Sequence, residues 1–358
     1  MQFGSDNQTG ASRRVLDMME KANSGHARGY GADEWTQAGV EALRTLFACD
    51  LEAFFVTTGT AANSLALSCL AQPWQAVLCH HQAHIFLDES TAPELFTGGA
   101  RLVPVSRGDG KITARHLEEY FRCAGDDVPH NALAGALSLT QSSEIGLVYT
   151  PGEVADLCGA AHGRGLKVHM DGARFANAVA SLGRPPADLT WKAGVDVLCL
   201  GATKCGALAA EAVVFFDREL AATFAHRRKR AGHLLSKGRF LASQFLGWLR
   251  DDHWLELASH ANRCASELAL ELSAIPGVDV VWPVQASEIF VVMPKATASA
   301  LRQAGAEFSE WYASALPPGF ELRDDQAFIR LVTSFVTEED HIWQFVSLAR
   351  ESSGTTAA

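Results

Sequence analysis

Lys204 and Glu211 are the only charged residues in LCLGATKCGALAAEAVVFF, the stretch that covers residues 198–216. A lysine between two strand-like apolar runs is costly to bury unless its amine is paired, neutralised or covalently bonded. A covalently used lysine amine is a nucleophile that forms an imine with a carbonyl group. The alternative is an apolar stem whose charged head reaches water, and Lys204 alone leaves both interpretations open.

Asp171 ends the apolar run LKVHMD and is followed at once by Gly172 and Arg174. In open α/β sheets, ligands bind outside the carboxyl ends of the strands, which favours a role for Asp171 in binding. A helix that begins in the next residues would equally use an aspartate as its N-cap. Asp171 alone therefore supports either a ligand contact or a cap.

The segment FFVTTGTAAN, residues 54–63, has the pattern of a strand, a turn and the start of a helix. Gly59 allows a tight turn, and Thr60 and Ala61 are small, so backbone amides would face outward at the helix N-terminus. Such amides, together with the helix dipole, bind phosphate. An ordinary threonine-capped helix is the alternative, and the segment contains neither a GxGxxG fingerprint nor a Walker loop.

A phosphate cradle, an aspartate and a lysine, each at the end of a predicted strand, have one natural common ligand. Pyridoxal phosphate needs an amine for its imine, a carboxylate for its pyridinium nitrogen and a cup for its phosphate. His84, in CHHQAHIFLDES, follows a predicted strand and could cover the cofactor ring and handle protons. A zinc site is the rival interpretation of these histidines, but no HExxH-like arrangement is present, so we predict no metal.

The elements that must position these groups form an α/β pattern. Short apolar runs alternate with helix-like or turn-like segments, as in a sheet that is covered on both faces and joined by right-handed βα units. The last two runs are close enough to form an antiparallel turn. The predicted strands cover residues 52–58, 75–80, 101–106, 135–141, 166–171, 196–201 and 211–216.

After the last of these runs the pattern changes. Residues 217–273 have the pattern of long helices, and residues 277–351 that of strand, strand, helix, strand and helix. A chain of 358 residues exceeds the size at which one core usually stops growing. We therefore predict a large domain over residues 1–250 and a smaller C-terminal α/β domain over residues 251–358.

Composition limits the partners and the location. The formal net charge of −11 argues against non-specific binding to nucleic acid or to an anionic membrane. The eight cysteines form no CxxC pair, which suits a reduced interior. No signal-peptide pattern and no uncharged apolar run of transmembrane length is present. We expect a soluble cytoplasmic protein that acts on a small molecule.

The sequence resembles the threonine aldolases of the pyridoxal-phosphate-dependent β-eliminating lyase group. Within that group it is similar to the low-specificity L-threonine aldolases and, over residues 208–216 and 227–241, to L-phenylserine aldolase. The resemblance runs nearly end to end. It is carried by SDN 5–7, GTAANSLAL 59–67, the His84 region with DE 88–89 and APE 92–94, HMDGARFANA 169–178, LTWKAGVDVLCLGATK 189–204 and FIRLVTSF 328–335.

This resemblance implies the aspartate-aminotransferase-like fold, known as PLP fold type I. That fold has a large domain with a seven-stranded mixed sheet and a smaller C-terminal α/β domain. The resemblance also implies a homotetramer with active sites shared between subunits, and pyridoxal 5'-phosphate as the cofactor. Lys204 would carry the cofactor as an imine, and Asp171 would keep its pyridine nitrogen protonated. Gly59, Thr60 and Ala61 would hold the phosphate.

The remaining roles follow from the same resemblance. Arg174 would contact the cofactor's phenolate oxygen or the substrate carboxylate, and Arg330 would clamp that carboxylate with a hydrogen bond from Ser5. Arg230 and Lys237 would reach the phosphate of a neighbouring subunit.

The implied reaction is a retro-aldol cleavage of L-phenylserine or L-threonine to glycine and an aldehyde. We expect His84 to take the β-hydroxyl proton, with Glu89 as the second choice. Gln141 and Glu144 are expected as supporting or pocket groups. Cys205 departs from the Asn or Gly that is common after the lysine, so activity or sensitivity to oxidation could differ. A different fold type I enzyme, namely a β-lyase, racemase or aminotransferase, and a non-catalytic cofactor-binding protein are the alternatives.

Overall fold

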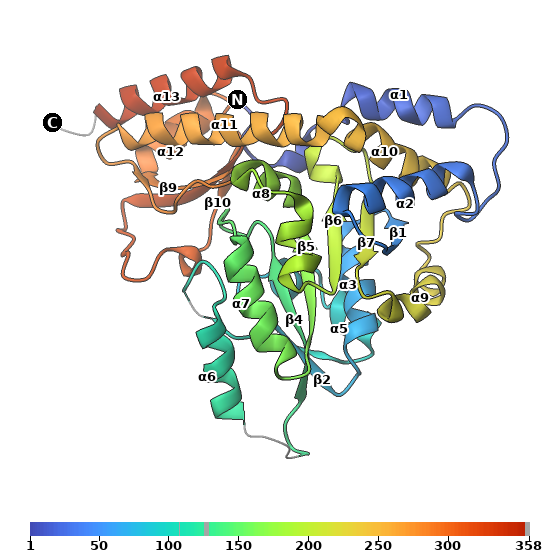
Figure 1. Cartoon of the computed structure of the whole chain (residues 1–358). Helices are drawn as coiled ribbons and strands as arrows, with labels where there is room; N and C mark the ends of the chain where they lie inside the picture. The colour runs from blue at the N-terminus through green and yellow to red at the C-terminus, as the bar shows by residue number, and fades with distance from the viewer. Residues whose placement is uncertain (107, 125–128, 355–358) are drawn as a thin grey trace.

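A seven-stranded mixed sheet forms the centre of the chain, in a computed structural model that describes residues 1–106, 108–124 and 129–354 (Figure 1). The strand order is β1-β7-β6-β5-β4-β2-β3, and only β7 runs antiparallel to its neighbours. All seven predicted strands and the antiparallel pairing of the last two are confirmed. The strands are β1 Glu52–Val56, β2 Gln75–Cys79, β3 Arg101–Pro104, β4 Leu133–Thr140, β5 Lys167–Gly172, β6 Val197–Gly201 and β7 Glu211–Phe215.

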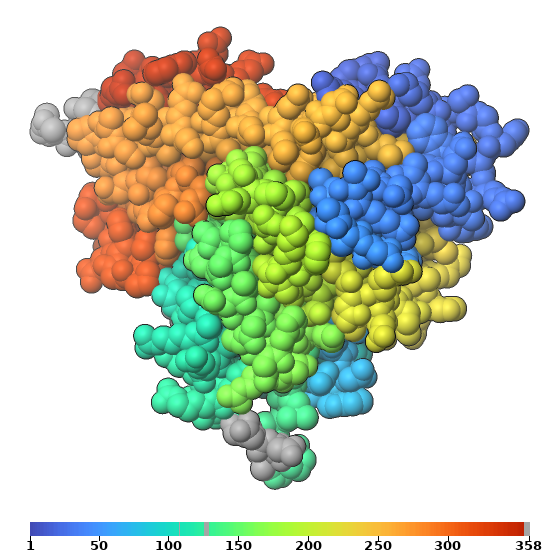
Figure 2. All heavy atoms as spheres, viewed as in Figure 1, coloured from blue at the N-terminus to red at the C-terminus, as the bar shows by residue number. Residues whose placement is uncertain are grey.

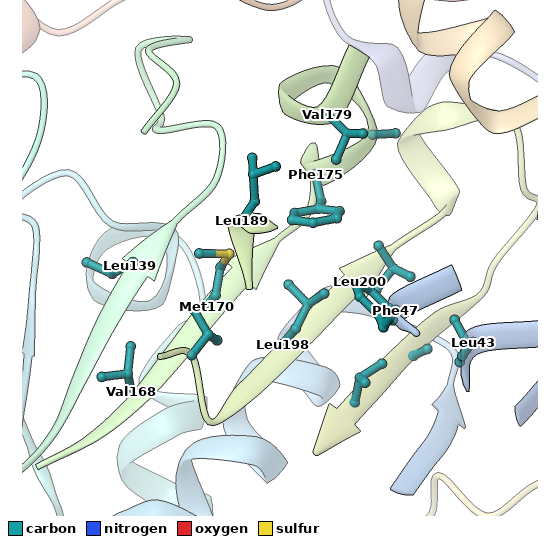
Figure 3. Close-up of a cluster of buried hydrophobic side chains, with 14 of the residues drawn as sticks. Leu43, Phe47, Leu139, Val168, Met170, Phe175, Val179, Leu189, Leu198 and Leu200 are labelled. Carbon is teal, nitrogen blue, oxygen red and sulfur yellow. The ribbon is translucent and has the colours of Figure 1, made fainter. Parts of the chain in front are cut away.

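Both faces of the sheet are buried, which explains why its central strands are apolar without alternation. On β6, Leu198 and Leu200 point into one core, whereas Val197 and Cys199 point into the other. Figure 3 shows the first core, where Leu198 and Leu200 lie near Phe47.

Helices cover each face of the sheet. The first core receives side chains from α1 Arg13–Ala22, α2 Glu34–Phe47, α6 Ala114–Ala124, α7 Pro151–His162, α8 Phe175–Leu182 and α10 Arg239–Leu249. The second receives them from α3 Gly59–Leu70, α4 His84–Leu87, α5 Ala92–Thr97 and α9 Phe224–Arg230. This arrangement leaves the carboxyl ends of the parallel strands open at one edge of the sheet, where ligands bind in such folds.

A second, antiparallel sheet of order β10-β11-β9-β8 forms the C-terminal part. The predicted sequence of strand, strand, helix, strand and helix is confirmed, with the short β10 in addition. The elements are β8 Asp279–Val280, β9 Glu288–Pro294, α12 Lys295–Gln303, β10 Ser309–Glu310, β11 Gln326–Val332 and α13 Glu339–Gly354.

The long helix α11, His253–Ser273, joins the two parts and runs across the top of the molecule (Figures 1 and 2). Its Trp254 lies in the first core of the large sheet, whereas its Leu268 lies in the core of the C-terminal sheet. Phe3 also belongs to the C-terminal core, where its ring lies 5.2 Å from that of Phe345. The C-terminal core thus contains side chains from the N-terminal segment as well as from α11. The predicted domain boundary at residue 250 stays a prediction.

Within residues 1–106, 108–124 and 129–354, no helix is both long enough and apolar enough to cross a membrane.

Candidate active site

A cavity of about 280 Å³ lies at the carboxyl ends of β5 and β6, beside the start of α3. It brings together groups that the sequence places far apart. The predicted residues that line it are Gly59, Thr60, His84, Glu89, Glu144, Asp171, Arg174 and Lys204.

The start of α3 forms one end of this cavity. Thr58 caps the helix, because its Oγ1 accepts a hydrogen bond from Ala61 N at 3.2 Å. The amides of Gly59 and Thr60, in the first turn, have no carbonyl partner inside the helix. An added Cβ on Gly59 would meet no atom within 4 Å, so this turn faces open space. The two amides can therefore hold a phosphate, while Ala61 N is engaged by the cap.

Asp171 lies at the end of β5 with only 4% of its surface exposed. Its Oδ2 accepts a hydrogen bond from Asn63 Nδ2 at 2.8 Å, and its Oδ1 accepts one from Ala173 N at 3.0 Å. A buried carboxylate that is held from two sides can face a protonated ring nitrogen. The hydrogen bond from Ala173 N to Asp171 Oδ1 also closes a local turn before the following helix.

Lys204 lies in a 3₁₀ turn, Thr203–Cys205, directly after β6. The nearby Glu211 at the start of β7 is buried, and its Oε1 accepts a hydrogen bond from Thr203 Oγ1 at 2.6 Å. Burial raises the pKa of Glu211 to about 7, even though Thr203 and the charge of Lys204 act in the opposite direction. The half-buried Lys204 thus shares its end of the cavity with a weakly acidic carboxyl group.

His84 and Glu89, which both line the first cavity, form a hydrogen-bonded dyad. His84 Nδ1 lies 2.9 Å from Glu89 Oε1, and that oxygen also accepts a hydrogen bond from Asn63 Nδ2 at 2.8 Å. Hydrogen bonding to Glu89 raises the pKa of His84, and burial raises the pKa of Glu89. When Glu89 is ionised, Nδ1 must be the donor, which leaves Nε2 as the free acceptor of the imidazole ring.

A second cavity of about 290 Å³ adjoins the first. Five residues line both cavities: Asn7, His84, Glu144, Arg174 and Lys204. The second cavity adds polar groups from distant segments and an apolar wall of Leu87, Trp311 and Tyr312. Ser5 and Arg330, both predicted to bind substrate, line it as well.

Arg174 is already neutralised in this arrangement. Its Nε donates to Asp6 Oδ2 at 2.7 Å, and its Nη2 donates to Asp6 Oδ1 at 3.0 Å. Its Nη1 also lies 3.3 Å from Glu288 Oε1. Burial alone would raise the pKa of Asp6, but the positive charges of Arg174, Lys204 and Arg330 outweigh it and lower that pKa. Arg174 therefore fixes Asp6 and Glu288 at the junction of the two cavities.

Arg330 is less fully satisfied than Arg174. Its Nη1 lies 3.7 Å from Glu288 Oε1, beyond hydrogen-bond distance, and its buried Nε has no partner. The guanidinium group stacks 4.1 Å from the centre of the Trp311 ring, and burial lowers the pKa of Arg330. A buried cation with an unused donor favours an anionic ligand in the second cavity.

Other predicted residues lie elsewhere. Arg230 and Lys237 are exposed and line neither cavity. Gln141 is buried and exchanges two hydrogen bonds with the backbone of Tyr149, so it supports the loop after β4. Cys205 is buried with its Sγ 3.6 Å from Trp254 O, and it lines neither cavity; burial raises the pKa of its thiol to about 12.

The sequence did not identify several residues of the site, among them Asn63, Glu211, Glu288 and Trp311. Three of these carry a signal, since a polar or charged side chain stands in or beside an apolar run. Trp311 carries no such signal, because the sequence does not distinguish an aromatic residue in a hydrophobic core from one in a binding site. Among the residues that the structure describes, no group of three or more His, Cys, Asp or Glu side chains could hold a metal ion.

Comparison with known proteins gives a consistent result. A family model described as β-eliminating lyase matches residues 2–296. The chain is 44% identical over 313 residues to the low specificity L-threonine aldolase of Pseudomonas sp. (strain NCIMB 10558), which covers 87% of this chain and 90% of that protein. It is 45% identical over 307 residues to the Pseudomonas aeruginosa low specificity L-threonine aldolase, with 86% and 88% of the two chains covered. The solved threonine aldolase structure from Leishmania major superposes with a TM-score of 0.90 at 27% identity, covering 98% of this chain and 99% of that one.

Proposed function

The chain belongs to the β-eliminating lyase family, whose members depend on pyridoxal phosphate, and from that premise we propose that it cleaves L-β-hydroxy-α-amino acids. The substrates would be L-threonine and L-phenylserine, and the products glycine and an aldehyde. The observation that carries the proposal is the meeting of the two cavities at Lys204. One cavity suits the cofactor, and the other offers a cation for the carboxylate of an amino acid.

The residues of the first cavity suit the cofactor. Lys204 would hold it through a covalent imine, and Asp171 would face its ring nitrogen. The free amides of Gly59 and Thr60 would hold its phosphate, and the ring of His84 would cover its face. When bound, pyridoxal phosphate supplies an electron sink for the electron pair of the bond that breaks at the substrate α-carbon.

The second cavity suits the rest of the substrate. Arg330 would bind the carboxylate because its Nε has no other partner, with Ser5 beside it. Arg174 is less suited to that task, since its guanidinium group is already bonded to Asp6. The apolar wall of Leu87 and Tyr312 would receive the side chain of an aromatic substrate.

The β-hydroxyl group needs a proton acceptor, and His84 is our choice. It lines both cavities, and its hydrogen bond to Glu89 would keep Nε2 free for this proton. Glu89 does not line the second cavity, so in our proposal it would act through its hydrogen bond to His84.

The homotetramer, the cytoplasmic location and the roles of Arg230 and Lys237 remain predictions. Arg230 and Lys237 are exposed and line neither cavity of their own chain. In our proposal they would contact the phosphate of a cofactor that is bound to a neighbouring subunit. Every cysteine is free of disulfide bonding, which suits a reducing compartment.

The release of benzaldehyde and glycine from L-phenylserine, and of acetaldehyde from L-threonine, tests the proposal directly. A β-lyase, racemase or aminotransferase would bind the same cofactor without releasing glycine. A non-catalytic binding protein would show the absorbance of the bound cofactor without turnover.

A further inference from the structure

Glu144 lies where the two cavities meet, together with Asn7, His84, Arg174 and Lys204. If Lys204 carries the cofactor, the reacting carbons of the substrate must lie at this junction. Arg174 is bonded to Asp6, and Asn7 has a neutral side chain. Among the described residues that line both cavities, Glu144 is therefore the one acidic group, and the proposed function leaves it without a task.

The two carboxyl oxygens of Glu144 differ. Oε1 accepts hydrogen bonds from His84 N at 2.9 Å and from Thr140 Oγ1 at 2.8 Å. Oε2 is buried and has no hydrogen-bond partner among the described residues. A buried polar atom without a partner is costly, and a polar group of a ligand at the junction would supply one.

The same contacts determine where a proton would lie. Two donors already occupy Oε1, so a proton on this carboxyl group belongs on Oε2. Burial raises the pKa of Glu144 to about 7, and the charge of Asp171 adds to the effect, while the bonds from Thr140 and His84 oppose it. The titratable and charged groups around it are Cys79, His84, Asp88, Glu89, Tyr149, Asp171, Arg174, Lys204, Glu211, Glu288 and Arg330.

We propose, building on the function proposed above, that Glu144 is a further catalytic residue whose protonated carboxyl group donates a hydrogen bond from Oε2 to the β-oxygen of the substrate. His84 Nε2 takes the hydroxyl proton, and the electron pair of the O–H bond becomes part of the C=O bond of the aldehyde. The Cα–Cβ bond breaks, and its pair remains with the carbon that becomes the α-carbon of glycine. Glu144 keeps its proton and stabilises the negative charge that develops on the oxygen.

Two substitutions of the same residue separate this role from others. In Glu144→Gln the amide oxygen takes the place of Oε1, because both donors point there, and the amide NH₂ takes the place of Oε2. This variant keeps a donor that does not titrate, so kcat should stay within about tenfold of the wild-type value. Glu144→Ala loses the donor, and kcat should fall by roughly 10² to 10³, the usual effect of removing one such contact.

The pH profile gives a second readout. Wild-type kcat should decline as pH rises through the pKa of Glu144 in the substrate complex, which lies above its value in the open cavity because substrate displaces water. Glu144→Gln should abolish this decline. Thr140→Val removes a bond that favours the ionised carboxylate, so it should move the decline to higher pH.

A third readout needs neither cofactor nor turnover. Infrared titration of the cofactor-free protein should show protonated carboxyl absorbance that disappears near pH 7, with contributions from Glu144 and Glu211, because burial raises both pKa values to about 7. The contribution of Glu144 is the difference between the wild type and Glu144→Gln. It should move to higher pH in Thr140→Val and stay unchanged in Glu118→Gln, whose carboxylate is exposed and lines neither cavity.

The outcomes are distinct. A wild-type enzyme that releases no aldehyde overturns the proposed function itself. With an active wild type, a loss of kcat in Glu144→Gln as large as that in Glu144→Ala would make Glu144 a base and overturn the donor role. A decline at high pH that persists in Glu144→Gln would overturn it as well. Retained absorbance of bound cofactor in both variants excludes misfolding as the cause.

Discussion

Asn63 Nδ2 donates a hydrogen bond to Asp171 Oδ2 at 2.8 Å. The same nitrogen donates to Glu89 Oε1, which in turn is bonded to His84 Nδ1. A single amide on α3 thus joins the carboxylate expected at the cofactor nitrogen to the dyad expected to take the substrate proton. The orientation of Asp171 and that of His84 are coupled through one side chain.

Asp171→Asn should retain some cofactor but lose most turnover. A neutral amide cannot hold a pyridinium nitrogen as firmly as a carboxylate, and hydrogen bonds with a charged partner contribute about 1.5–3 kcal/mol. We expect kcat to fall by about 10- to 100-fold. Cofactor absorbance and kcat of the purified variant measure the two effects separately. Asp17→Asn is the control, because Asp17 is a half-buried carboxylate paired with Arg13 on α1 and lines neither cavity. Normal turnover in correctly folded Asp171→Asn would refute the assignment.

Lys204→Ala should abolish covalent attachment of the cofactor. The wild-type protein should be yellow, and borohydride reduction should remove its visible band and leave the label on Lys204. Peptide mapping by mass spectrometry locates the label. Lys192→Ala, which removes an exposed lysine paired with Asp188, should label like the wild type. A label on any other lysine of the wild-type protein would contradict the assignment.

The strands and the groups at their ends could be predicted from the sequence for a physical reason. A sheet that is buried on both faces requires apolar runs, and the chemistry lies where each run stops, as at Asp171 after β5 and Lys204 after β6. The short segment between Gly201 and Glu211 leaves room only for a turn, which made the antiparallel pairing of β6 with β7 accessible as well.

Contacts between side chains could not be predicted in the same way. Asn63 and Asp171 are 108 residues apart, and Arg174 and Asp6 are 168 apart, so only the folded backbone brings them together. No local pattern indicates that Arg174 is already paired. The sequence therefore identified two arginines for the substrate carboxylate, whereas the contacts favour Arg330.

Glu211→Gln should flatten the dependence of stability on pH in the cofactor-free protein. The pKa of Glu211 is about 7 in the folded chain, above its ordinary value of 4.5. Between these values the folded state binds more protons than the unfolded state, so stability falls as pH rises. The whole contribution is at most about 3.5 kcal/mol, at about 1.4 kcal/mol for each pKa unit.

Urea unfolding at pH 5, 6, 7 and 8 measures this effect. The wild-type free energy of unfolding should decline more steeply with pH than that of Glu211→Gln, because only the wild type has the Glu211 carboxyl group. The variant should keep some decline, because burial also raises the pKa values of Glu144 and Glu89. Glu118→Gln should follow the wild type. Parallel curves for the wild type and Glu211→Gln would show that Glu211 is ionised at a lower pH than we expect.

Both L-threonine and L-β-phenylserine should be cleaved, with the higher kcat/KM for the aromatic substrate. The second cavity offers an apolar wall in which Tyr312 and Leu87 can contact a phenyl ring. Tyr312→Ala should lower kcat/KM for phenylserine more than kcat/KM for threonine, whose methyl group has far less apolar surface than a phenyl ring, so threonine serves as the internal control. A tenfold preference for threonine in the wild type, about 1.4 kcal/mol at the transition state, would exclude the phenylserine specificity.

His84→Phe separates ring contact from proton transfer. Phenylalanine can still cover the cofactor ring, so cofactor binding should persist, and it keeps the backbone N–H that donates to Glu144. If His84 takes the hydroxyl proton, turnover should fall by roughly 10² to 10⁴.

The pH dependence identifies the group that is lost. The bond to Glu89 raises the pKa of His84, and a base must be neutral to accept a proton, so wild-type kcat should rise with pH through that pKa. This rise at the acid side should vanish in His84→Phe and persist in Glu144→Gln, which keeps the imidazole ring and lacks only the carboxyl group that accepts from His84 N. Near-normal turnover in His84→Phe would instead move the base to Glu89 or to a water molecule. Glu89→Gln would then decide between these two, because a loss of turnover in that variant assigns the proton to Glu89.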